Sequence, residues 1–557
     1  MTRPRSITQF CGFWNLRAGV TLLALAFLGL FLLYPLWLVL QSSVRDDVTG
    51  ALTLAPYAQI LSSRYYLGSF GNSLAAGAMS MILATLVGVP LAFCLARVDV
   101  PGKPLLLTLS SMPLVLPSFV SAYALVLLFG HAGVATVALR SLGIAVGSVY
   151  GMPGIVIVYT LTLYPYVLLP TLAGFKAIDV AVEEAARNLG ASRWHAFRTV
   201  LLPIVVPSVL AGALLVFIEA LENFGVPAVL AEDRPFLALD IFKLFFGESD
   251  SNAAVAGALS VLLVGCTVAV LMLQRHYLGR RRFTTNARQA PPLLRLGRAW
   301  RLLATVFCWG MVLASVLPFG AVVVISFQRF RGPVLSWQLG LGNYNALLNG
   351  SYRALFNTLL LASLAAMAAT ALGAPIGYVL ARHRGRLSTL LDIIGVIPFA
   401  VSGTVLGIGL IVAFNSGWLV LTGGWLILVV AYVVRKLPFS IRSASAIVRQ
   451  IDPSLEEASI NLGVSPLKTF LILTVPLMLG GLVGGMVLVW VTVAAELSST
   501  IVLYSSRWTT MTVLMFHSLE GTAPGEAAAA ASILILFTAL PLLLVYRLLR
   551  RYDSSLS

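Results

Sequence analysis

The sequence predicts an all-α polytopic membrane protein of about twelve transmembrane helices, arranged as two tandem halves of six helices each. Three observations predict this fold. Hydrophobic residues make up 59% of the 557 residues and charged residues 10%, with a mean hydropathy of +0.94, which is far from the composition of soluble domains. Apolar stretches of spanning length recur along the chain. A polar segment is also repeated at a fixed spacing, which indicates a duplicated fold.

The first half contains six stretches without Asp, Glu, Lys or Arg. Each is long enough for a spanning helix, which needs about 20 residues. These stretches cover residues 18–44, 65–96, 104–139, 141–175, 199–218 and 251–274. We therefore expect six spans in this half.

The second half contains five such stretches, at residues 302–328, 354–381, 393–434, 469–495 and 527–546. The third of these is long enough for two helices, and Asn415, Ser416 and Gly417 divide it. The total is then twelve. Because six is an even number, both halves enter the membrane in the same orientation, as a parallel repeat related by a pseudo-two-fold axis along the membrane normal.

The net charge of +16 is placed unevenly along the chain. Between Arg275 and Arg301 there are eight arginines and no acidic residue. Basic residues beside spans stay cytoplasmic, so residues 276–300 are interpreted as a basic cytoplasmic linker between a first transmembrane half (1–275) and a second (301–557). The two termini are then cytoplasmic as well. Because the arginines flank two spans, they favour an orientation signal over nucleic-acid binding.

The repeat is clearest in two polar segments that begin at Glu183 and Glu456, 273 residues apart. The matched runs are Glu183-Glu184-Ala185-Ala186-Arg187-Asn188-Leu189-Gly190 and Glu456-Glu457-Ala458-Ser459-Ile460-Asn461-Leu462-Gly463. Earlier matches have a spacing of 285, and they are Asn72-Ser73-Leu74 with Asn357-Thr358-Leu359 and Ala96-Arg97 with Ala381-Arg382. The difference of about a dozen residues predicts an insertion in the first half, within residues 131–147.

Each polar segment predicts a helix, a sharp bend and a second helix at the water-facing edge of the membrane domain. Early carboxylates favour the positive end of the first helix, and Gly190 or Gly463 is placed to take the left-handed conformation that ends it. Small residues on the first helix suit a surface that fits a groove on another protein.

Intramembrane carboxylates are the second candidate site. Glu219 and Glu222, three residues apart, share a helix face near the outer end of the fifth span, and Asn223 follows. Glu496 takes a near-equivalent place in the second half after a one-residue shift. Carboxylates at this depth face a cavity or a partner. They are therefore candidates for a translocation path, and the alternative is interfacial acids that pair locally with Ser, Thr or Asn.

Catalytic chemistry is not indicated. The four cysteines and five histidines are scattered, without the spacing of a metal site, so no metal ligand is assigned, and no nucleophile constellation emerges. The phosphate-binding pattern Gly-x-x-x-x-Gly-Lys-Ser/Thr does not occur in the sequence. The chain is therefore not expected to be an enzyme, and any ATP must be handled by another subunit.

The polar segments resemble the signature of permease subunits of binding-protein-dependent ABC importers. That signature reads Glu-Ala-Ala, three residues, Gly, nine residues, a hydrophobic residue, one residue, Leu-Pro. It is matched by Glu184-Ala185-Ala186, Gly190, Val200 and Leu202-Pro203, and by Glu457-Ala458-Ser459, Gly463, Leu473 and Val475-Pro476. Ser459 and Val475 are mild departures from the pattern.

This resemblance implies a fold like that of type I ABC importer permeases, in which each polar segment is a coupling helix that docks on an ATPase. The implied docking residues are Glu183, Glu184, Ala185, Ala186, Gly190, Glu456, Glu457, Ala458, Ser459 and Gly463. The implied partners are two copies of an ABC ATPase subunit, a periplasmic solute-binding protein and the lipid bilayer of the inner membrane. ATP is used by the partner, and this chain binds no cofactor.

The fused twelve-span organisation, Glu222-Asn223-Phe224-Gly225 and Ala495-Glu496-Leu497-Ser498-Ser499-Thr500 are similar to the ferric-iron permeases of this family. Oxygen ligands suit a hard trivalent cation. Fused relatives also carry thiamine or 2-aminoethylphosphonate, so these cargoes remain alternatives. An ion-coupled secondary transporter is the rival of another class, because it too has twelve spans in a parallel repeat, although it needs no pair of docking helices.

Overall fold

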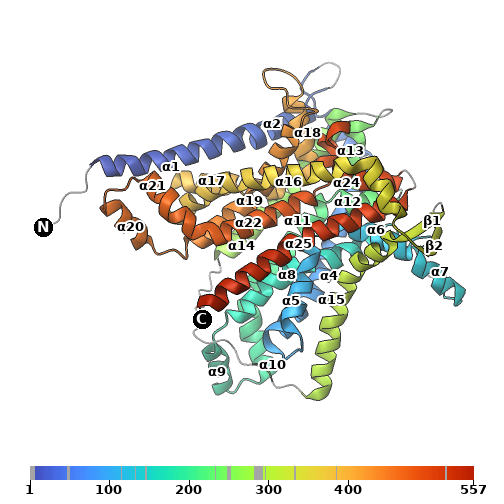
Figure 1. Cartoon of the computed structure of the whole chain (residues 1–557), viewed down its shortest axis with the longest axis horizontal. Helices are drawn as coiled ribbons and strands as arrows, with labels where there is room; N and C mark the ends of the chain where they lie inside the picture. Colours follow the sequence, from blue (N-terminus) through green and yellow to red (C-terminus); the bar gives the residue numbers. More distant parts are fainter. Residues whose placement is uncertain are drawn as a thin grey trace. The chain divides into compact units, whose positions relative to one another are not determined.

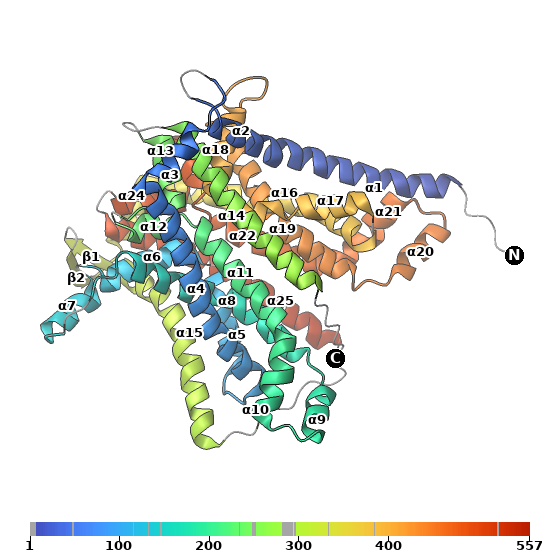
Figure 2. The same ribbon diagram turned by 180° about the vertical axis from the view of Figure 1, so that it is seen from behind.

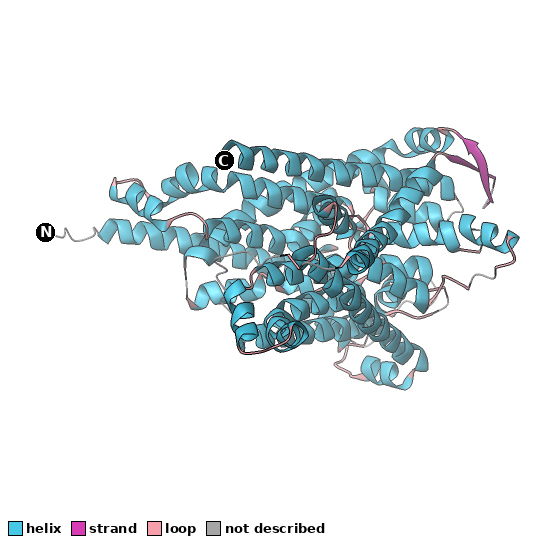
Figure 3. Ribbon diagram, turned by 90° about the horizontal axis from the view of Figure 1, so that it is seen from below, coloured by secondary structure: helices cyan, strands magenta, loops and turns pink. Residues whose placement is uncertain are grey.

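The computed structural model describes residues 7–46, 50–114, 116–131, 133–144, 147–232, 234–247, 252–280, 293–294, 297–331, 334–383, 385–520 and 523–556. Within these residues the fold is almost entirely helical, as Figures 1 and 3 show. Most of the linker predicted at residues 276–300 lies outside the described residues.

The first half is built from helices alone in its described part. Its elements are α1 (Ile7–Leu28), η1 (Gly29–Leu33), α2 (Tyr34–Ser43), α3 (Ala55–Ser62), α4 (Arg64–Arg97), α5 (Lys103–Ser111), η2 (Met112–Leu114), α6 (Ser118–Phe129), α7 (Val134–Ser141), α8 (Met152–Lys176), α9 (Val180–Asn188), α10 (Arg193–Ala196), η3 (Phe197–Leu201), α11 (Leu202–Glu222), α12 (Gly225–Leu230), α13 (Leu237–Phe246) and α14 (Ala253–Arg280).

The second half repeats this order and adds a hairpin. Its elements are α15 (Arg298–Ser326), β1 (Gln328–Arg331), β2 (Val334–Leu339), α16 (Gly342–Arg382), α17 (Arg386–Ile394), η4 (Ile397–Ala400), α18 (Gly403–Phe414), α19 (Trp425–Val448), α20 (Pro453–Asn461), α21 (Pro466–Thr469), η5 (Phe470–Thr474), α22 (Val475–Ala494), α23 (Thr500–Leu503), η6 (Ser506–Trp508), α24 (Met511–Glu520) and α25 (Pro524–Leu556). Strands β1 and β2 are antiparallel, pair from Gln328 with Leu339 to Arg331 with Val334, and carry an irregularity after Gln328.

Irregular helical turns recur at matching places. The π-helical turns η3 and η5 each lie just before a proline, Pro203 or Pro476, at the start of the next long helix. Because proline has no N–H to donate, a locally widened turn is a common accommodation at such a site. The repeat in sequence is therefore also a repeat in local backbone geometry.

The number of spanning helices agrees with the prediction once one charged helix is considered. Among the described residues, ten helices are long and apolar enough to cross a membrane, and the pair Arg386–Ala400 and Gly403–Phe414, bent by 107°, brings the number to eleven. Helix α19 has 24 residues and stands where α8 stands in the first half. It contains Arg435, Lys436 and Arg442, which keep it out of that set. With α19 included, the described residues contain twelve candidate spans, which is the number expected.

The predicted insertion is confirmed. Helices α18 and α19 are joined by residues 415–424, whereas α6 and α8 are joined by residues 130–151. The connection between α6 and α8, in the first half, is twelve residues longer, which equals the difference between the spacings of 285 and 273. The extra residues include α7.

The chain forms two compact units, and each takes helices from both halves. Unit 1 consists of Met1–Arg45, Leu348–Phe516 and Ile533–Ser557, and unit 2 of Asp46–Leu347 and His517–Ser532. Helices α1 and α2 thus belong with the second-half helices, and α15 belongs with the first-half helices. The boundaries of the two predicted halves describe the repeat, whereas the units describe the packing.

In unit 1 the amino-terminal helices pack on second-half helices. Helix α1 contacts α17 and α21, and α2 contacts α18 (Figure 1). The rings of Phe31 and Tyr34 lie 5.5 and 6.2 Å from the ring of Phe414, measured between centroids. Aromatic pairs at these distances add to the stability gained from burial.

In unit 2 the core is formed by α4, α8 and α11, which contact one another along their lengths (Figure 2). Helix α15 packs against α4, α5, α6 and α8. It is fixed at one end by Arg301, which forms a salt bridge with Asp99 at 2.7 Å, and by the indole of Trp309, which donates to the carbonyl of Pro101 at 3.2 Å.

The repeated Asn-Ser/Thr pairs hold equivalent connections in the two units. In unit 2, Asn72 donates to the carbonyl of Pro235 and the hydroxyl of Ser73 accepts from the N–H of Leu237, at 3.0 and 2.9 Å. In unit 1, Asn357 donates to the carbonyl of Thr509 and Thr358 accepts from the N–H of Met511, at 2.9 and 2.8 Å. These bonds set the starts of α13 and α24, which follow the candidate path residues.

Candidate functional site

The first polar segment forms a bent pair of helices beyond the end of α8. Helix α9 carries Glu183 and Glu184, the bend falls at Gly190, and α10 leads into η3 and α11 (Figure 2). At its start, the side chain of Asp179 accepts from the N–H of Ala181 at 3.0 Å, which satisfies a helix N–H that would otherwise lack a partner. The segment therefore has the predicted helix, bend and helix.

The second polar segment has the same construction in unit 1. Helix α20 is capped by Asp452, which accepts from the N–H of Ser454 at 2.9 Å. This hydrogen bond lowers the pKa of Asp452 below its ordinary value. The bend falls at Gly463, and α21 and η5 lead into α22.

Gly190 and Gly463 have the left-handed conformation that the sequence predicted, with φ of +86° and +91°. The N–H of Ala191 donates to the carbonyl of Ala186 and that of Val464 to the carbonyl of Ser459, at 3.1 and 3.2 Å. These bonds satisfy carbonyls at the ends of α9 and α20. A Cβ atom at either glycine would meet no atom within 4 Å, so glycine is required here by backbone conformation, and not by lack of space.

One acid of each segment is tied to a long spanning helix. In unit 2, Glu183 on α9 forms a salt bridge with Arg97 at the end of α4. In unit 1, Glu456 on α20 forms one with Arg382 at the end of α16, at 2.9 Å. Arg382 also donates to the carbonyl of Ile451 at 2.8 Å. The two pairs occupy matched positions of the repeat.

The surroundings of these pairs differ by one hydroxyl. The hydroxyl of Tyr378 donates to Glu456 at 2.9 Å, and its ring packs on Phe470, with centroids 4.9 Å apart. In unit 2 the equivalent residues are Phe93 and Phe197, which pack at 5.2 Å. The aromatic contact is thus repeated, whereas the hydrogen bond to the acid is present in the second copy alone within the described residues.

The other acid of each segment points outward. Glu184 and Glu457 are exposed, as are Ala185 and Ala458, whereas Ala186 and Ser459 are half-buried. The hydroxyl of Ser459 lies 2.9 Å from that of Thr469 on α21. The predicted docking residues therefore divide into an inward set, which fixes the segment, and an outward set, which is free to face a partner.

Two leucines that the sequence analysis did not assign lie on the outward side. Leu189 is 89% exposed and Leu462 is 85% exposed, and they occupy the same position of the repeat. An exposed leucine that recurs at the same position of both copies is a candidate for contact with another protein. The sequence did offer a sign of these two residues, because both copies have a leucine directly before the glycine that ends the helix.

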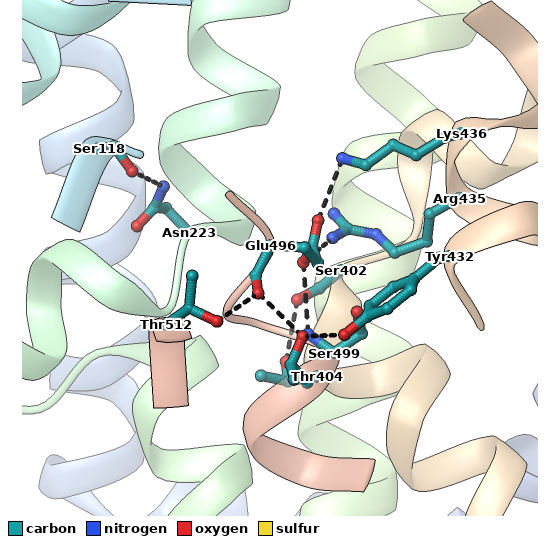
Figure 4. Close-up of polar contacts among 11 residues, drawn as sticks. Ser118, Asn223, Ser402, Thr404, Tyr432, Arg435, Lys436, Glu496, Ser499 and Thr512 are labelled. Carbon is teal, nitrogen blue, oxygen red and sulfur yellow. Dashed lines mark hydrogen bonds and ion pairs between the residues drawn. The ribbon is translucent and has the colours of Figure 1, made fainter. Parts of the chain in front are cut away.

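In unit 2 the candidate path residues lie where α11 ends. Glu219 is half-buried and Glu222 is buried. The side-chain oxygen of Asn223 accepts from the N–H of Val226 and so caps α12, and its amide donates to the hydroxyl of Ser118, both at 3.0 Å (Figure 4).

In unit 1 the acid Glu496 is 7% exposed and lies between two basic side chains of α19. Its carboxylate forms salt bridges with Arg435 and with Lys436, the latter at 3.0 Å (Figure 4). Its backbone carbonyl accepts from the hydroxyls of Thr500 and Thr512 at 2.8 and 2.9 Å. Glu496 is therefore the centre of a buried polar cluster.

The hydrogen bonds align Glu496 with Asn223. The carboxylate of Glu496 accepts from the N–H of Ser499, three residues on, at 3.4 Å, as Asn223 accepts from Val226. The one-residue shift that the sequence analysis placed before Glu496 falls after it, since Leu237 corresponds to Met511. An amide in one unit thus stands where a carboxylate stands in the other.

Sequence reasoning missed Arg435 and Lys436. The expected span ended at Val434 because the charge-free stretch ends there, whereas α19 continues to Val448. Two adjacent basic residues in the middle of a helix that matches an apolar helix of the other half were the available signal. Among the described residues, no group of three or more His, Cys, Asp or Glu side chains is arranged to hold a metal ion.

The repeated spans and the repeated bent segments define a class of protein, namely a fused transport permease of the membrane. The family model described as binding-protein-dependent transport system inner membrane component matches residues 84–283 and 373–557, once in each half. The chain belongs to this family. It is therefore a multi-pass transport subunit of an ABC importer.

Three relatives illustrate the range of the family. A ferric transport system permease protein of Actinobacillus pleuropneumoniae is 27% identical over 93% of this chain and 76% of its own length. An Fe(3+)-transport system permease protein of Haemophilus influenzae is 23% identical over 82% and 85%. A molybdate/tungstate transport system permease protein of Thermococcus kodakarensis is 26% identical over 48% of this chain and 99% of its own length.

Proposed function

We propose that this chain forms the translocation path of an ATP-driven importer for a solute delivered by a periplasmic binding protein, with ferric iron as the cargo. The observation that carries the proposal is the repeated bent segment, tied in each unit to a long spanning helix by a matched Arg–Glu salt bridge. An importer that is driven by two ATPase subunits needs two such attachment points.

The coupling helices are α9 and α20, and each would dock on one ATPase subunit. Glu184, Glu457 and the exposed leucines Leu189 and Leu462 would form the contact, because they are the outward residues of these helices. ATP would be bound by the partner subunits, since this sequence has no phosphate-binding loop. Two ATPase copies follow from two segments.

Movement of a coupling helix would reach the spanning helices through the buried salt bridges. Arg97 lies at the last residue of the 34-residue helix α4, and Arg382 at the last residue of α16. A buried charge pair resists separation, because parting it leaves an uncompensated charge in a medium of low dielectric constant. Each long helix would therefore follow its coupling helix as a rigid element.

The orientation that this mechanism requires is the one that the arginines between residues 275 and 301 favour. The coupling helices, the linker and both termini would face the cytoplasm of the cell, and the membrane would be the inner membrane. The α12 to α13 and α23 to α24 connections would face the binding protein.

Ferric iron as cargo is supported by two relatives that cover most of this chain and are named for ferric transport. The alternative cargoes are thiamine and 2-aminoethylphosphonate, and a half-length relative is named for molybdate and tungstate. An ion-coupled secondary transporter is the less favoured mechanism, because it has no use for two outward-facing coupling helices.

The test is reconstitution of the full chain with its ATPase subunit and binding protein in proteoliposomes. We expect accumulation of radioactive iron that requires ATP and the iron-loaded binding protein, and that unlabelled thiamine or 2-aminoethylphosphonate does not compete. An ATPase subunit unable to hydrolyse ATP is the control and should abolish uptake. Uptake driven by an ion gradient without the ATPase would contradict the proposed mechanism. Competition by thiamine or 2-aminoethylphosphonate would identify that solute, and not ferric iron, as the cargo.

A further inference from the structure

The polar cluster around Glu496 contains more positive than negative charge. Arg435 and Lys436 both form salt bridges with the single carboxylate of Glu496, so these three side chains carry one net positive charge. Arginine remains protonated at all physiological pH values. The side chains of Arg435 and Lys436 are each 14% exposed, whereas that of Glu496 is 6% exposed, so each cation keeps a larger accessible edge than the anion.

The cluster lies near the middle of a spanning helix. At about 1.5 Å per residue, Arg435 is roughly 15 Å along α19 from Trp425, which is half of a hydrocarbon core of about 30 Å. A cation at this depth is costly if it faces lipid. The accessible edges of Arg435 and Lys436 are therefore expected to face a polar space.

The groups beside the cations also favour an anion. Helix α18 begins at Gly403, and a Cβ atom there would lie 2.8 Å from Nη1 of Arg435, so the guanidinium lies against the positive end of this helix. The hydroxyls of Ser402 and Thr404, 2.9 Å apart, lie at the same helix start (Figure 4). Hydroxyls and a helix start are the usual companions of cations in oxyanion sites.

The fold does not require these charges. By the spacing of 273, the first-half equivalents of Arg435, Lys436 and Glu496 are Thr162, Leu163 and Asn223. Thr162 donates to the carbonyl of Val158 in its own helix. The same architecture is thus completed in unit 2 without a cation at either matched position, and the paired cations of unit 1 need another explanation.

We infer that Arg435, Lys436 and the start of α18 form an oxyanion-binding subsite, in which Glu496 occupies the cations when no oxyanion is present. The ligand is a phosphate, phosphonate, sulfate or carboxylate group, either free or as part of a larger solute. The inference rests on the proposed function for its placement on the path of the cargo. It implies that ferric iron passes this point together with an anionic ligand, because two cations repel a bare trivalent ion.

The test is equilibrium binding of radioactive inorganic phosphate to the full chain in complex with its ATPase subunit, in lipid nanodiscs without ATP or binding protein. We expect saturable binding of one phosphate per chain. Lys436→Gln should weaken the affinity about ten- to hundredfold, since it removes one charged hydrogen-bond donor. Glu496→Gln should strengthen it about tenfold, because it removes the competing carboxylate.

Two further variants separate binding from folding. Lys436→Arg keeps the charge and should keep most of the affinity. Arg442→Gln removes a cation from the same helix, whose partner Asp392 lies 3.2 Å away, and should leave the phosphate affinity unchanged. If Glu496→Gln cannot be purified as a folded complex, the phosphate affinities of Lys436→Gln and Lys436→Arg test the inference without it.

The inference is overturned if the wild-type complex binds no phosphate saturably, or if Lys436→Gln binds it as tightly as the wild type. Competition by sulfate, by 2-aminoethylphosphonate and by citrate then distinguishes a free oxyanion from one carried on a larger solute. Because the assay uses neither ATP nor the binding protein, its result is independent of the uptake experiment, and the two can fail separately.

Discussion

Arg382 donates two hydrogen bonds to one oxygen of Glu456, at 2.9 and 3.2 Å, and so joins the end of the spanning helix α16 to α20, the proposed second coupling helix. The Arg97–Glu183 pair makes the same connection in unit 2. The side chains of Arg382 and Glu456 are 12% and 7% exposed, so water screens their attraction little. This connection would give a rigid route from the proposed docking surface into the membrane domain.

Arg382→Met should destabilise the second coupling helix. It leaves Glu456 buried without its cation, which costs about 3–5 kcal/mol. We expect a lower melting temperature of the purified chain and weaker co-purification of the ATPase subunit. Arg386→Met, at an exposed position four residues on, is the control and should match the wild type. Restoration of the melting temperature in Arg382→Met/Glu456→Met would support the pairing, and equal stability of the single variant and the wild type would contradict it.

Tyr378→Phe makes the second copy resemble the first, in which Phe93 stands at this position. The change removes the hydrogen bond to Glu456 and keeps the ring contact with Phe470, so the loss should be about 1.5–3 kcal/mol. We expect reduced thermal stability with ATP-driven uptake largely retained, because the first copy has no such hydroxyl. Complete loss of uptake would show that the two copies are not interchangeable at this position.

Gly190→Val and Gly463→Val should uncouple ATP hydrolysis from uptake. The strain arises from the left-handed backbone alone, since a Cβ atom meets nothing within 4 Å, and it costs about 1–2 kcal/mol or more for a β-branched residue. Gly480→Val on α22 is the matched control, because Gly480 also has open space but lacks a positive φ. The measurement is stimulation of the ATPase by the cargo-loaded binding protein. Unchanged stimulation in both bend variants would remove these glycines from the coupling role.

The polar cluster of unit 1 predicts an order of stabilities. Lys436→Met leaves Glu496 paired with Arg435, and Arg435→Met leaves it paired with Lys436, so each variant keeps one charge of each sign. Glu496→Gln leaves both cations without their acid and should be the least stable, by about 3–5 kcal/mol relative to the wild type. Thermal unfolding in detergent measures this order. If Lys436→Met were the least stable of the three variants, the argument from the number of unpaired charges would be wrong.

Asp240 predicts a pH dependence of stability. Burial raises the pKa of Asp240, and the hydrogen bond from Tyr65, at 2.9 Å, opposes this only in part. A folded-state pKa above the unfolded value, about 3.9, contributes stability that is complete below the unfolded pKa and is lost as the pH rises through the folded pKa. At pH values above the folded-state pKa, Asp240→Asn should therefore have a higher melting temperature than the wild type. This difference should disappear as the pH falls toward 4.

The control for this prediction is Asp99→Asn, at an exposed salt bridge with Arg301, where the change should shift stability by less than about 1 kcal/mol. A wild-type advantage over Asp240→Asn at neutral pH would show that the ionised form is the stabilising one.

Much of the fold could be predicted because lipid leaves few ways to satisfy the backbone. Charge-free stretches located the spans, although the one expected to end at Val434 continues to Val448. Asn415 to Gly417 correctly divided residues 393–434, since α18 ends at Phe414 and α19 begins at Trp425. The glycine bends were predicted from local backbone requirements, and their φ angles confirm them.

What the sequence could not give was the partner of each charged or apolar face. Because spans were predicted from stretches without charged residues, one span was expected to end at Val434. No local signal indicates that Arg435 and Lys436 meet the distant carboxylate of Glu496. The docking role of the predicted residues remains a prediction. Nor does helical periodicity say which helices pack together, and so the exchange of α1, α2 and α15 between the halves appeared only with the contacts.

That exchange sets an order on how the polypeptide matures. During synthesis, α1 and α2 enter the membrane more than 300 residues before α17 and α18, the helices on which they finally pack. Until those helices emerge, the single span that η1, α2 and the second half of α1 form, Ala18–Ser43, lacks the helices on which it packs. A gene cut at the basic stretch would therefore yield two fragments, neither of which could complete its own compact body, although each would contain a whole copy of the ancestral repeat.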